Sequence, residues 1–140
     1  MVQDIRAAQE SYHSETQQYA DISNSLTSYY PKAAPNGRTV TGWGAACGAC
    51  ALDWAVLPLH VDGPVLFGYA TVAGAANTNP SSVGAPASVK VNGQMMAFPA
   101  PSPVDWFIVA AGCDLDNDGV VKTFVYTTSW ANQVYVDEEE

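Results

Sequence analysis

The sequence predicts an α+β domain, in which an N-terminal amphipathic helix packs on an antiparallel β-sheet. Helical periodicity is confined to the first part of the chain, and the second half consists of short apolar runs separated by turns. The length of 140 residues falls within the roughly 100–200 residues of one domain. Because the chain has no repeat and no linker, we expect residues 1–140 to form a single domain.

The N-terminal segment carries the predicted helix, over about residues 2–22. Five apolar residues fall on one helical face: Ile5, Ala8, Tyr12, Tyr19 and Ile22. Polar residues from Asp21 to Ser25 favour local bonds to the backbone and are expected to end the helix. The apolar stripe is in phase from Val2, and no capping residue precedes it. This pattern predicts the end of a longer helix whose beginning was removed.

An irregular loop is predicted next, over about residues 29–53, because this segment is rich in Pro, Gly and Asn-Gly. Loops of this length are usually functional or are held in place by packing or cross-links. Trp43 and a disulfide could hold this loop. The chain has three cysteines, Cys47, Cys50 and Cys113. The first two form a C-x-x-C that lacks the partners of a haem, zinc or thioredoxin-like site, so a loop disulfide is predicted. We favour Cys47–Cys50, but pairing of either residue with Cys113 stays open.

Residues 54–136 are predicted to be β-rich. The apolar runs predict strands at Trp54–His60, Val65–Val72, Ser88–Val91, Gln94–Phe98, Trp106–Ala111, Val120–Thr128 and Gln133–Val136. The strongest local signal is Asn92-Gly93, which is typical of a type I′ turn between two paired strands.

Composition narrows the classes of partner. Five Lys and Arg residues against 14 Asp and Glu residues give a net charge of −9 and a pI near 4.3. Nucleic acids and anionic lipid surfaces bind basic proteins, so neither is expected as a partner. Charged residues make up only 14% of the chain, which indicates the low-charge surface of an exported protein.

An acidic turn is the sharpest motif. Asp114, Asp116 and Asp118, followed by Gly119, match the first half of an EF-hand loop, in which alternate carboxylates surround one hard cation. The carbonyl of Val120 would supply a further oxygen. Position 12 of the loop is Val125 instead of the bidentate Glu, so a complete EF-hand is excluded. We predict a Ca²⁺ site at this turn, and the alternative is a solvated turn between two strands.

Signs of enzyme chemistry are missing, and we predict that the protein is not an enzyme. The chain has no nucleophile elbow, no zinc-protease motif and no phosphate-binding glycine loop. His13 and His60 are expected to be ordinary surface residues. Asp53 and Asp105 could form a carboxylate pair, but nothing in the sequence brings them together.

The segment from Ala8 to Tyr19 resembles a known family. Its text, A-Q-E-S-Y-H-S-E-T-Q-Q-Y, is similar to the A-Q-x-x-Y-x-x-E-x-x-x-Y stretch where the long helix of type IV pilins and type II secretion pseudopilins enters the globular head. The order of parts is similar too: helix, irregular segment, antiparallel sheet and acidic turn. The resemblance implies a pilin-like head whose apolar anchor helix is missing from this chain.

The resemblance implies a structural function. The protein would be a subunit of a type IV pilus or type II secretion pseudopilus filament, held in the inner membrane by the missing helix before assembly. Its partners would be other subunits of the filament, and its location the periplasm or the cell surface. Two alternatives remain: an extracellular Ca²⁺-dependent module that binds carbohydrate or mediates adhesion, with an aromatic cleft beside the acidic turn, and a hydrolase with a pocket that joins His60 to a carboxylate or to Cys50.

Overall fold

The fold is that of a computed structural model, which describes residues 1–44 and 53–138. Its elements follow the chain in the order α1 (Val2–Thr16), β1 (Gly68–Gly74), the 3₁₀ turn η1 (Pro80–Val83), β2 (Ser88–Val91), β3 (Gln94–Ala97), β4 (Trp106–Cys113), β5 (Thr123–Thr128) and β6 (Ala131–Glu138). The predicted α+β class is confirmed. Cys47 and Cys50 lie outside the described residues, so the predicted disulfide stays a prediction.

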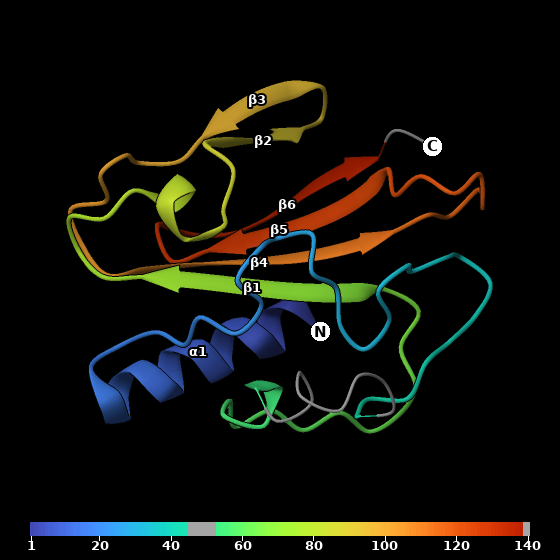
Figure 1. The fold of residues 1–140 in the computed structure, drawn as a ribbon, viewed down its shortest axis with the longest axis horizontal. Coiled ribbons are helices and arrows are strands. Elements are labelled where there is room, and N and C mark those ends of the chain that lie inside the picture. The colour runs from blue at the N-terminus through green and yellow to red at the C-terminus, as the bar shows by residue number, and fades with distance from the viewer. Residues whose placement is uncertain (45–52, 139–140) are drawn as a thin grey trace.

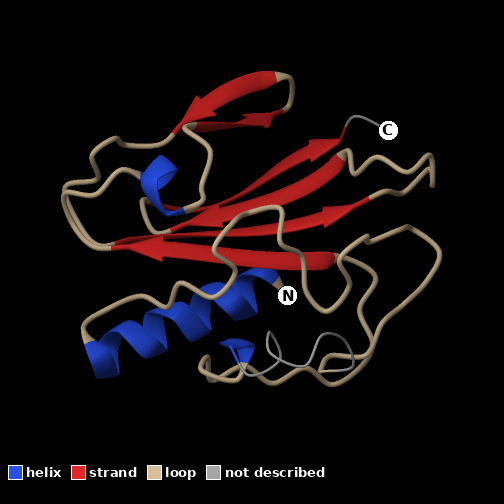
Figure 2. Ribbon diagram, in the orientation of Figure 1, coloured by secondary structure: helices blue, strands red, loops and turns tan. Residues whose placement is uncertain are grey.

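The elements form three layers around a four-stranded antiparallel sheet. The strand order is β1-β4-β5-β6, and β2 pairs with β3 in a separate hairpin. Helix α1 lies along one side of the sheet in Figures 1 and 2, whereas the hairpin and η1 lie on the other. The N-terminal helix therefore packs on the antiparallel sheet, as predicted.

Strand β4 connects the two cores, because its side chains alternate between the faces of the sheet. Phe107, Val109 and Ala111 pack in the cluster that contains α1. Trp106, Ile108 and Ala110 pack in the cluster beneath the hairpin. Every residue of the strand is buried, which explains why its sequence is continuously apolar instead of alternating.

Helix α1 ends earlier than predicted, at Thr16 instead of near residue 22. Gln17 adopts a left-handed conformation, with φ of 62°, and its N–H caps the carbonyl of His13. Tyr19 and Ile22 nevertheless reach the core from the extended segment that follows. The apolar spacing therefore identified residues that contact the core but assigned two of them to the wrong secondary structure.

Gln9 fastens α1 to the sheet although it is polar. Its side chain is 0% exposed and donates hydrogen bonds to the Ala20 carbonyl at 2.7 Å and the Thr71 hydroxyl at 3.0 Å. Its amide oxygen accepts a bond from the Ala20 N–H at 2.8 Å. Gln9 thus joins the helix, the segment after it and strand β1 through a satisfied buried network.

Arg6 makes a second polar attachment, one turn closer to the N-terminus. Its guanidinium donates to the carbonyls of Thr128 and Ala131, where β5 turns into β6, and lies 5.9 Å from the centre of the Phe107 ring. Together, Gln9 and Arg6 attach α1 to both edge strands of the sheet, β1 and β6.

The predicted strand at Trp54–His60 is wrong. No residue from 55 to 64 lies in a strand, and the described strands begin at Gly68. Trp54 and Leu57, three residues apart, are both buried against the α1 cluster, which is not the alternation of a strand. Trp43 does pin the preceding loop as predicted, because its ring packs at 4.9 Å from Tyr30 and 5.2 Å from Trp54, measured between centroids.

The predicted hairpin is confirmed. Ser88–Val91 pairs with Gln94–Ala97, and both turn residues have positive φ, 49° at Asn92 and 76° at Gly93. These are the angles that a type I′ turn requires.

Four tyrosines make the fold sensitive to alkaline pH. Burial raises the pKa of Tyr29 and Tyr69 to about 12, and burial together with Glu10 raises the pKa of Tyr19 to about 12. Burial also raises the pKa of Tyr126. The unfolded chain ionises near pH 10, so their contribution to stability is complete below that pH and is lost as the pH rises toward 12. We expect the phenolate absorbance of these residues to appear together with the unfolding transition. Full ionisation near pH 10 in a chain that stays folded would contradict this result.

Candidate metal centre

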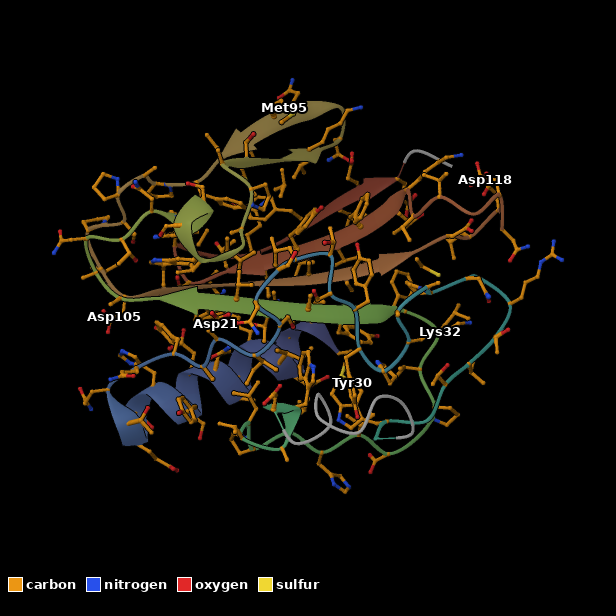
Figure 3. All side chains as sticks on the ribbon, in the orientation of Figure 1. Asp21, Tyr30, Lys32, Met95, Asp105 and Asp118 are labelled. Carbon is orange, nitrogen blue, oxygen red and sulfur yellow. The ribbon has the colours of Figure 1, made fainter. Side chains whose placement is uncertain are left out.

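The acidic turn connects β4 to β5 at one end of the sheet. Asp114 follows the last residue of β4 and is only 5% exposed. Its backbone is held against the irregular loop, because its N–H donates to Pro35 at 2.9 Å and its carbonyl accepts from Gly37 at 2.6 Å. Figure 3 shows Asp118 at this end of the molecule, and Asp105 at the other. Asp114, the first predicted ligand, is therefore held in place at the end of β4.

Carboxylates within the turn organise its backbone. Asp114 accepts hydrogen bonds from the N–H groups of Asp118, at 3.1 Å, and Gly119, at 2.8 Å. Asp116 also accepts from Asp118, and Asp118 accepts from Val120 at 2.9 Å. Gly119 has a φ of 93°, which suits glycine and permits the sharp turn. All three aspartates consequently face one small region.

The structure brings the three predicted carboxylate ligands together. One oxygen from each of Asp114, Asp116 and Asp118 lies within 4.8 Å of the others. Two ligands of a Ca²⁺ ion, at 2.3–2.6 Å each, are separated by at most about 5 Å, so the spacing fits a shared cation. Val120 donates its N–H to Asp118, and the predicted role of its carbonyl stays a prediction.

Lys122 partly neutralises the turn. Its ammonium forms ion pairs with Asp118 and, at 3.4 Å, with Asp116. The hydrogen bond to Asp118 raises the pKa of Lys122, and the backbone N–H of Asp118, aided by Lys122, lowers the pKa of Asp116. Three carboxylates and one ammonium leave a net charge of −2, so a divalent cation would neutralise the turn in competition with Lys122.

We expect Ca²⁺ to stabilise the protein through this turn. Extracellular sites with few ligands bind Ca²⁺ with dissociation constants on the order of 10⁻⁴–10⁻³ M. A free concentration about ten times the dissociation constant would raise the free energy of unfolding by about 1.4 kcal/mol. Thermal unfolding with and without Ca²⁺ measures the effect.

Two variants with opposite expected effects test the assignment. Asp116→Asn keeps an acceptor for the Asp118 N–H but removes one anionic ligand, so the Ca²⁺-dependent shift should fall sharply. Lys122→Gln removes the competing cation. One pair of unit charges 4 Å apart in water attracts by about 1 kcal/mol, so the loss of one such competing ion pair should tighten Ca²⁺ binding about fivefold. If calorimetric titration with Ca²⁺ gives the same weak heats for both variants and for the unmodified chain, the assignment of a calcium site is contradicted.

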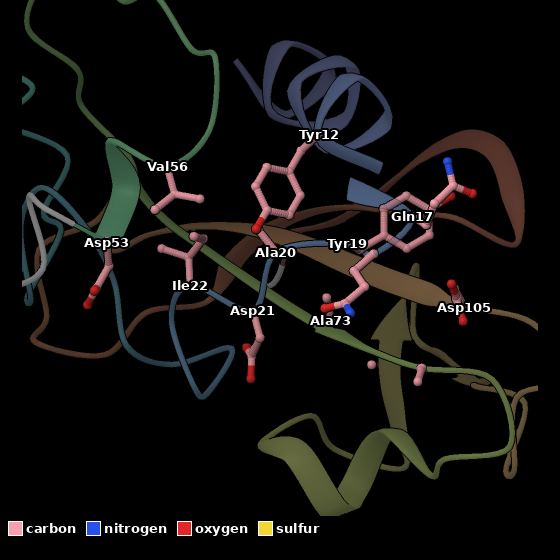
Figure 4. A pocket seen from close by; sticks show the side chains of 13 residues that line it. Tyr12, Gln17, Tyr19, Ala20, Asp21, Ile22, Asp53, Val56, Ala73 and Asp105 are labelled. Atoms are coloured by element: carbon pink, nitrogen blue, oxygen red, sulfur yellow. The ribbon is translucent and has the colours of Figure 1, made fainter. Parts of the chain in front are cut away.

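A groove at the opposite end of the sheet was not predicted. It has a volume of about 720 Å³ and lies between the end of α1, the segment after it and the end of β1. Figure 4 shows Asp21, Asp53 and Asp105 around it, with Tyr12 and Tyr19. Partial desolvation in the groove raises the pKa of Asp21, whereas hydrogen bonds from the backbone of Ala73 and Asn24 lower it by a smaller amount. The acids are 32 and 52 positions apart in the chain, so no local motif could reveal them.

Asp105 and the two histidines have specific partners. Asp105 accepts from the Ala76 N–H at 2.8 Å and lies 3.4 Å from His13, whose ring stacks on Tyr19. His13, predicted to be an ordinary surface residue, is about one third exposed and packs against specific partners. His60 pairs with Asp62 at 2.8 Å, and both side chains are about nine-tenths exposed.

Cys113 and a small cavity lie near the acidic turn. Cys113 is buried at the end of β4, with its sulfur 4.0 Å from the Leu66 carbonyl oxygen. The cavity next to the acidic turn, of about 210 Å³, is lined by small, polar and aliphatic residues: Ala34, Pro35, Asn36, Asp114, Asn117, Gly119 and Val121. This lining lacks the aromatic rings expected for a carbohydrate cleft beside the turn.

Comparisons with known proteins add no relative. No family model matches this sequence, and no curated protein or solved structure is detectably similar to it. Within residues 1–44 and 53–138, none of the helices has the length and apolar character needed to cross a membrane.

Proposed function

We propose that this chain is the globular head of a filament subunit, of the type IV pilin or type II secretion pseudopilin kind. The proposal is supported by the packing of the segment from Ala8 to Tyr19, on which the resemblance depends. Ala8 is buried against the sheet, Gln9 makes the buried network described above, and Tyr19 packs edge-on against Phe107 at 4.8 Å. Three of the family-like positions, Ala8, Gln9 and Tyr19, thus join the N-terminal segment to the head, whereas Glu15 is exposed.

This attachment suits a mechanical function. Because α1 is held by apolar packing and by the side chains of Gln9 and Arg6, force applied along the helix would pass directly into the sheet. In the proposed subunit, an apolar segment preceding α1 anchors the protein in the inner membrane and later lies in the filament centre. The partners are further subunits, which contact the exposed faces of the head.

The acidic turn contributes stability in this proposal. Bound Ca²⁺ would brace the turn between β4 and β5, and Asp114 of this turn is hydrogen-bonded to the irregular loop through its backbone. The protein performs no catalysis in this role. A Ca²⁺-dependent carbohydrate module is less well supported, because the cavity beside the turn has no aromatic lining.

Shearing of cells that produce the protein tests the proposal. Antibodies raised against the folded chain should label filaments in the sheared fraction by immunogold electron microscopy, and cells that lack the gene provide the control. Recovery of the protein only as a soluble monomer, with unlabelled filaments, would contradict the proposal.

A further inference from the structure

The chain contains two Asn-Gly dipeptides, which the fold places in opposite environments. Asn36-Gly37 lies in the irregular loop, and Asn92-Gly93 forms the turn of the β2–β3 hairpin. In such a dipeptide, the glycine nitrogen can attack the asparagine side chain, because glycine has no side chain to hinder the approach. We propose that Asn92 is a site of spontaneous deamidation and that Asn36 is protected from it.

The reaction needs no co-reactant except water. The nitrogen of Gly93 loses its proton to a base and forms a bond with Cγ of Asn92. The bond between Cγ and Nδ2 then breaks, and the amide nitrogen leaves as ammonia after taking up a proton. Water opens the resulting succinimide at either carbonyl, which gives aspartate or isoaspartate. No atom is oxidised or reduced.

The hairpin turn leaves Asn92 and Gly93 accessible and provides a base. Both residues are exposed, and a Cβ atom added to Gly93 would meet nothing within 4 Å. The Gly93 N–H points at a carboxylate oxygen of Asp137, 3.5 Å away. Asp137 is itself 3% exposed on β6, so this oxygen is held in place as a general base for the attacking nitrogen.

Both partners of the reaction are restrained at the other dipeptide. The side-chain oxygen of Asn36 accepts hydrogen bonds from the N–H groups of Arg38, at 3.2 Å, and Thr39, at 2.9 Å. The Gly37 N–H donates to the neutral carbonyl of Asp114 at 2.6 Å. The backbone of Leu115 packs so closely that a Cβ on Gly37 would lie 2.8 Å from it. The loop therefore prevents the rotation that attack requires.

Modification of Asn92 would weaken the hairpin. Either product adds a negative charge near Asp137. Isoaspartate also inserts a methylene into the backbone of a two-residue turn, which cannot then keep the register that pairs Val91 with Gln94. The hairpin covers the core that contains Trp106, so slow ageing of Asn92 would loosen one layer of the fold.

Peptide mapping by mass spectrometry of the intact chain, incubated at neutral pH, tests the inference. Because a positioned general base typically contributes 10²- to 10⁴-fold, we expect product at Asn92 to form at least about tenfold faster than at Asn36. Asp137→Asn should slow the reaction at Asn92. The rate at Asn36 reports any general loosening of that variant, because unfolding would release Asn36 as well.

A second variant keeps the test independent of Asp137. Asn92→Gln should abolish product at this position and leave the rate at Asn36 unchanged, because the longer side chain cannot close the same five-membered ring. Equal rates at the two dipeptides, or faster reaction at Asn36, would overturn the proposal. An unchanged rate at Asn92 in Asp137→Asn would overturn the assignment of the base.

Discussion

Replacement of Gln9 by leucine is expected to destabilise the protein by about 4 kcal/mol. Leucine fills a similar volume but leaves the N–H and carbonyl of Ala20 buried without partners, and each such group costs about 1–3 kcal/mol. The Thr71 hydroxyl would keep its bond to the Ile108 carbonyl. Urea denaturation followed by circular dichroism should show a lower midpoint with an unchanged slope.

Gln3→Leu is the matched control for this prediction. Gln3 lies on the same helix, and its side chain is exposed, so the same chemical change should alter stability by less than about 0.5 kcal/mol. Similar midpoints for the two variants would show that Gln9 does not fasten α1 to the sheet. That result would remove the main structural support for a helix that transmits force to the head.

Replacement of Gly84 by alanine is expected to cost about 3–4 kcal/mol. Gly84 caps η1 with a φ of 89°, where a side chain costs about 1–2 kcal/mol. An added Cβ would also lie 1.8 Å from the Asn24 carbonyl oxygen, so the segment after α1 would have to move. Such overpacking typically costs a further 1–3 kcal/mol.

Gly93→Ala separates these two contributions. Gly93 also has a positive φ, of 76°, but nothing lies within 4 Å of a Cβ placed there. This variant should therefore lose only the conformational part, about 1–2 kcal/mol. Equal losses in the two variants, measured by thermal unfolding, would contradict the close contact between η1 and the segment at Asn24.

Features encoded by neighbouring residues were predictable from the sequence. The hairpin depends on Asn92-Gly93, and the acidic turn on three aspartates within five positions, so local turn chemistry determines both. Strand β4 was predictable because a central strand covered on both faces is apolar throughout.

Features that depend on tertiary contacts were not predictable in this way. The end of α1 at Thr16 depends on a left-handed glutamine, a residue that gives no stop signal in a sequence. The apolar run at Trp54–His60 was read as a strand because apolar composition alone cannot distinguish a strand from a buried irregular segment. The groove between Asp21, Asp53 and Asp105 joins distant parts of the chain, and only the fold brings them together.

Electron cryo-microscopy of surface filaments from cells that produce this protein tests the central claim most directly. We expect each subunit to show the described head, with α1 on the β1-β4-β5-β6 sheet and continued at its N-terminal end by a helix that runs into the filament axis. Filaments built from a different fold, with this protein absent from their density, would contradict the claim.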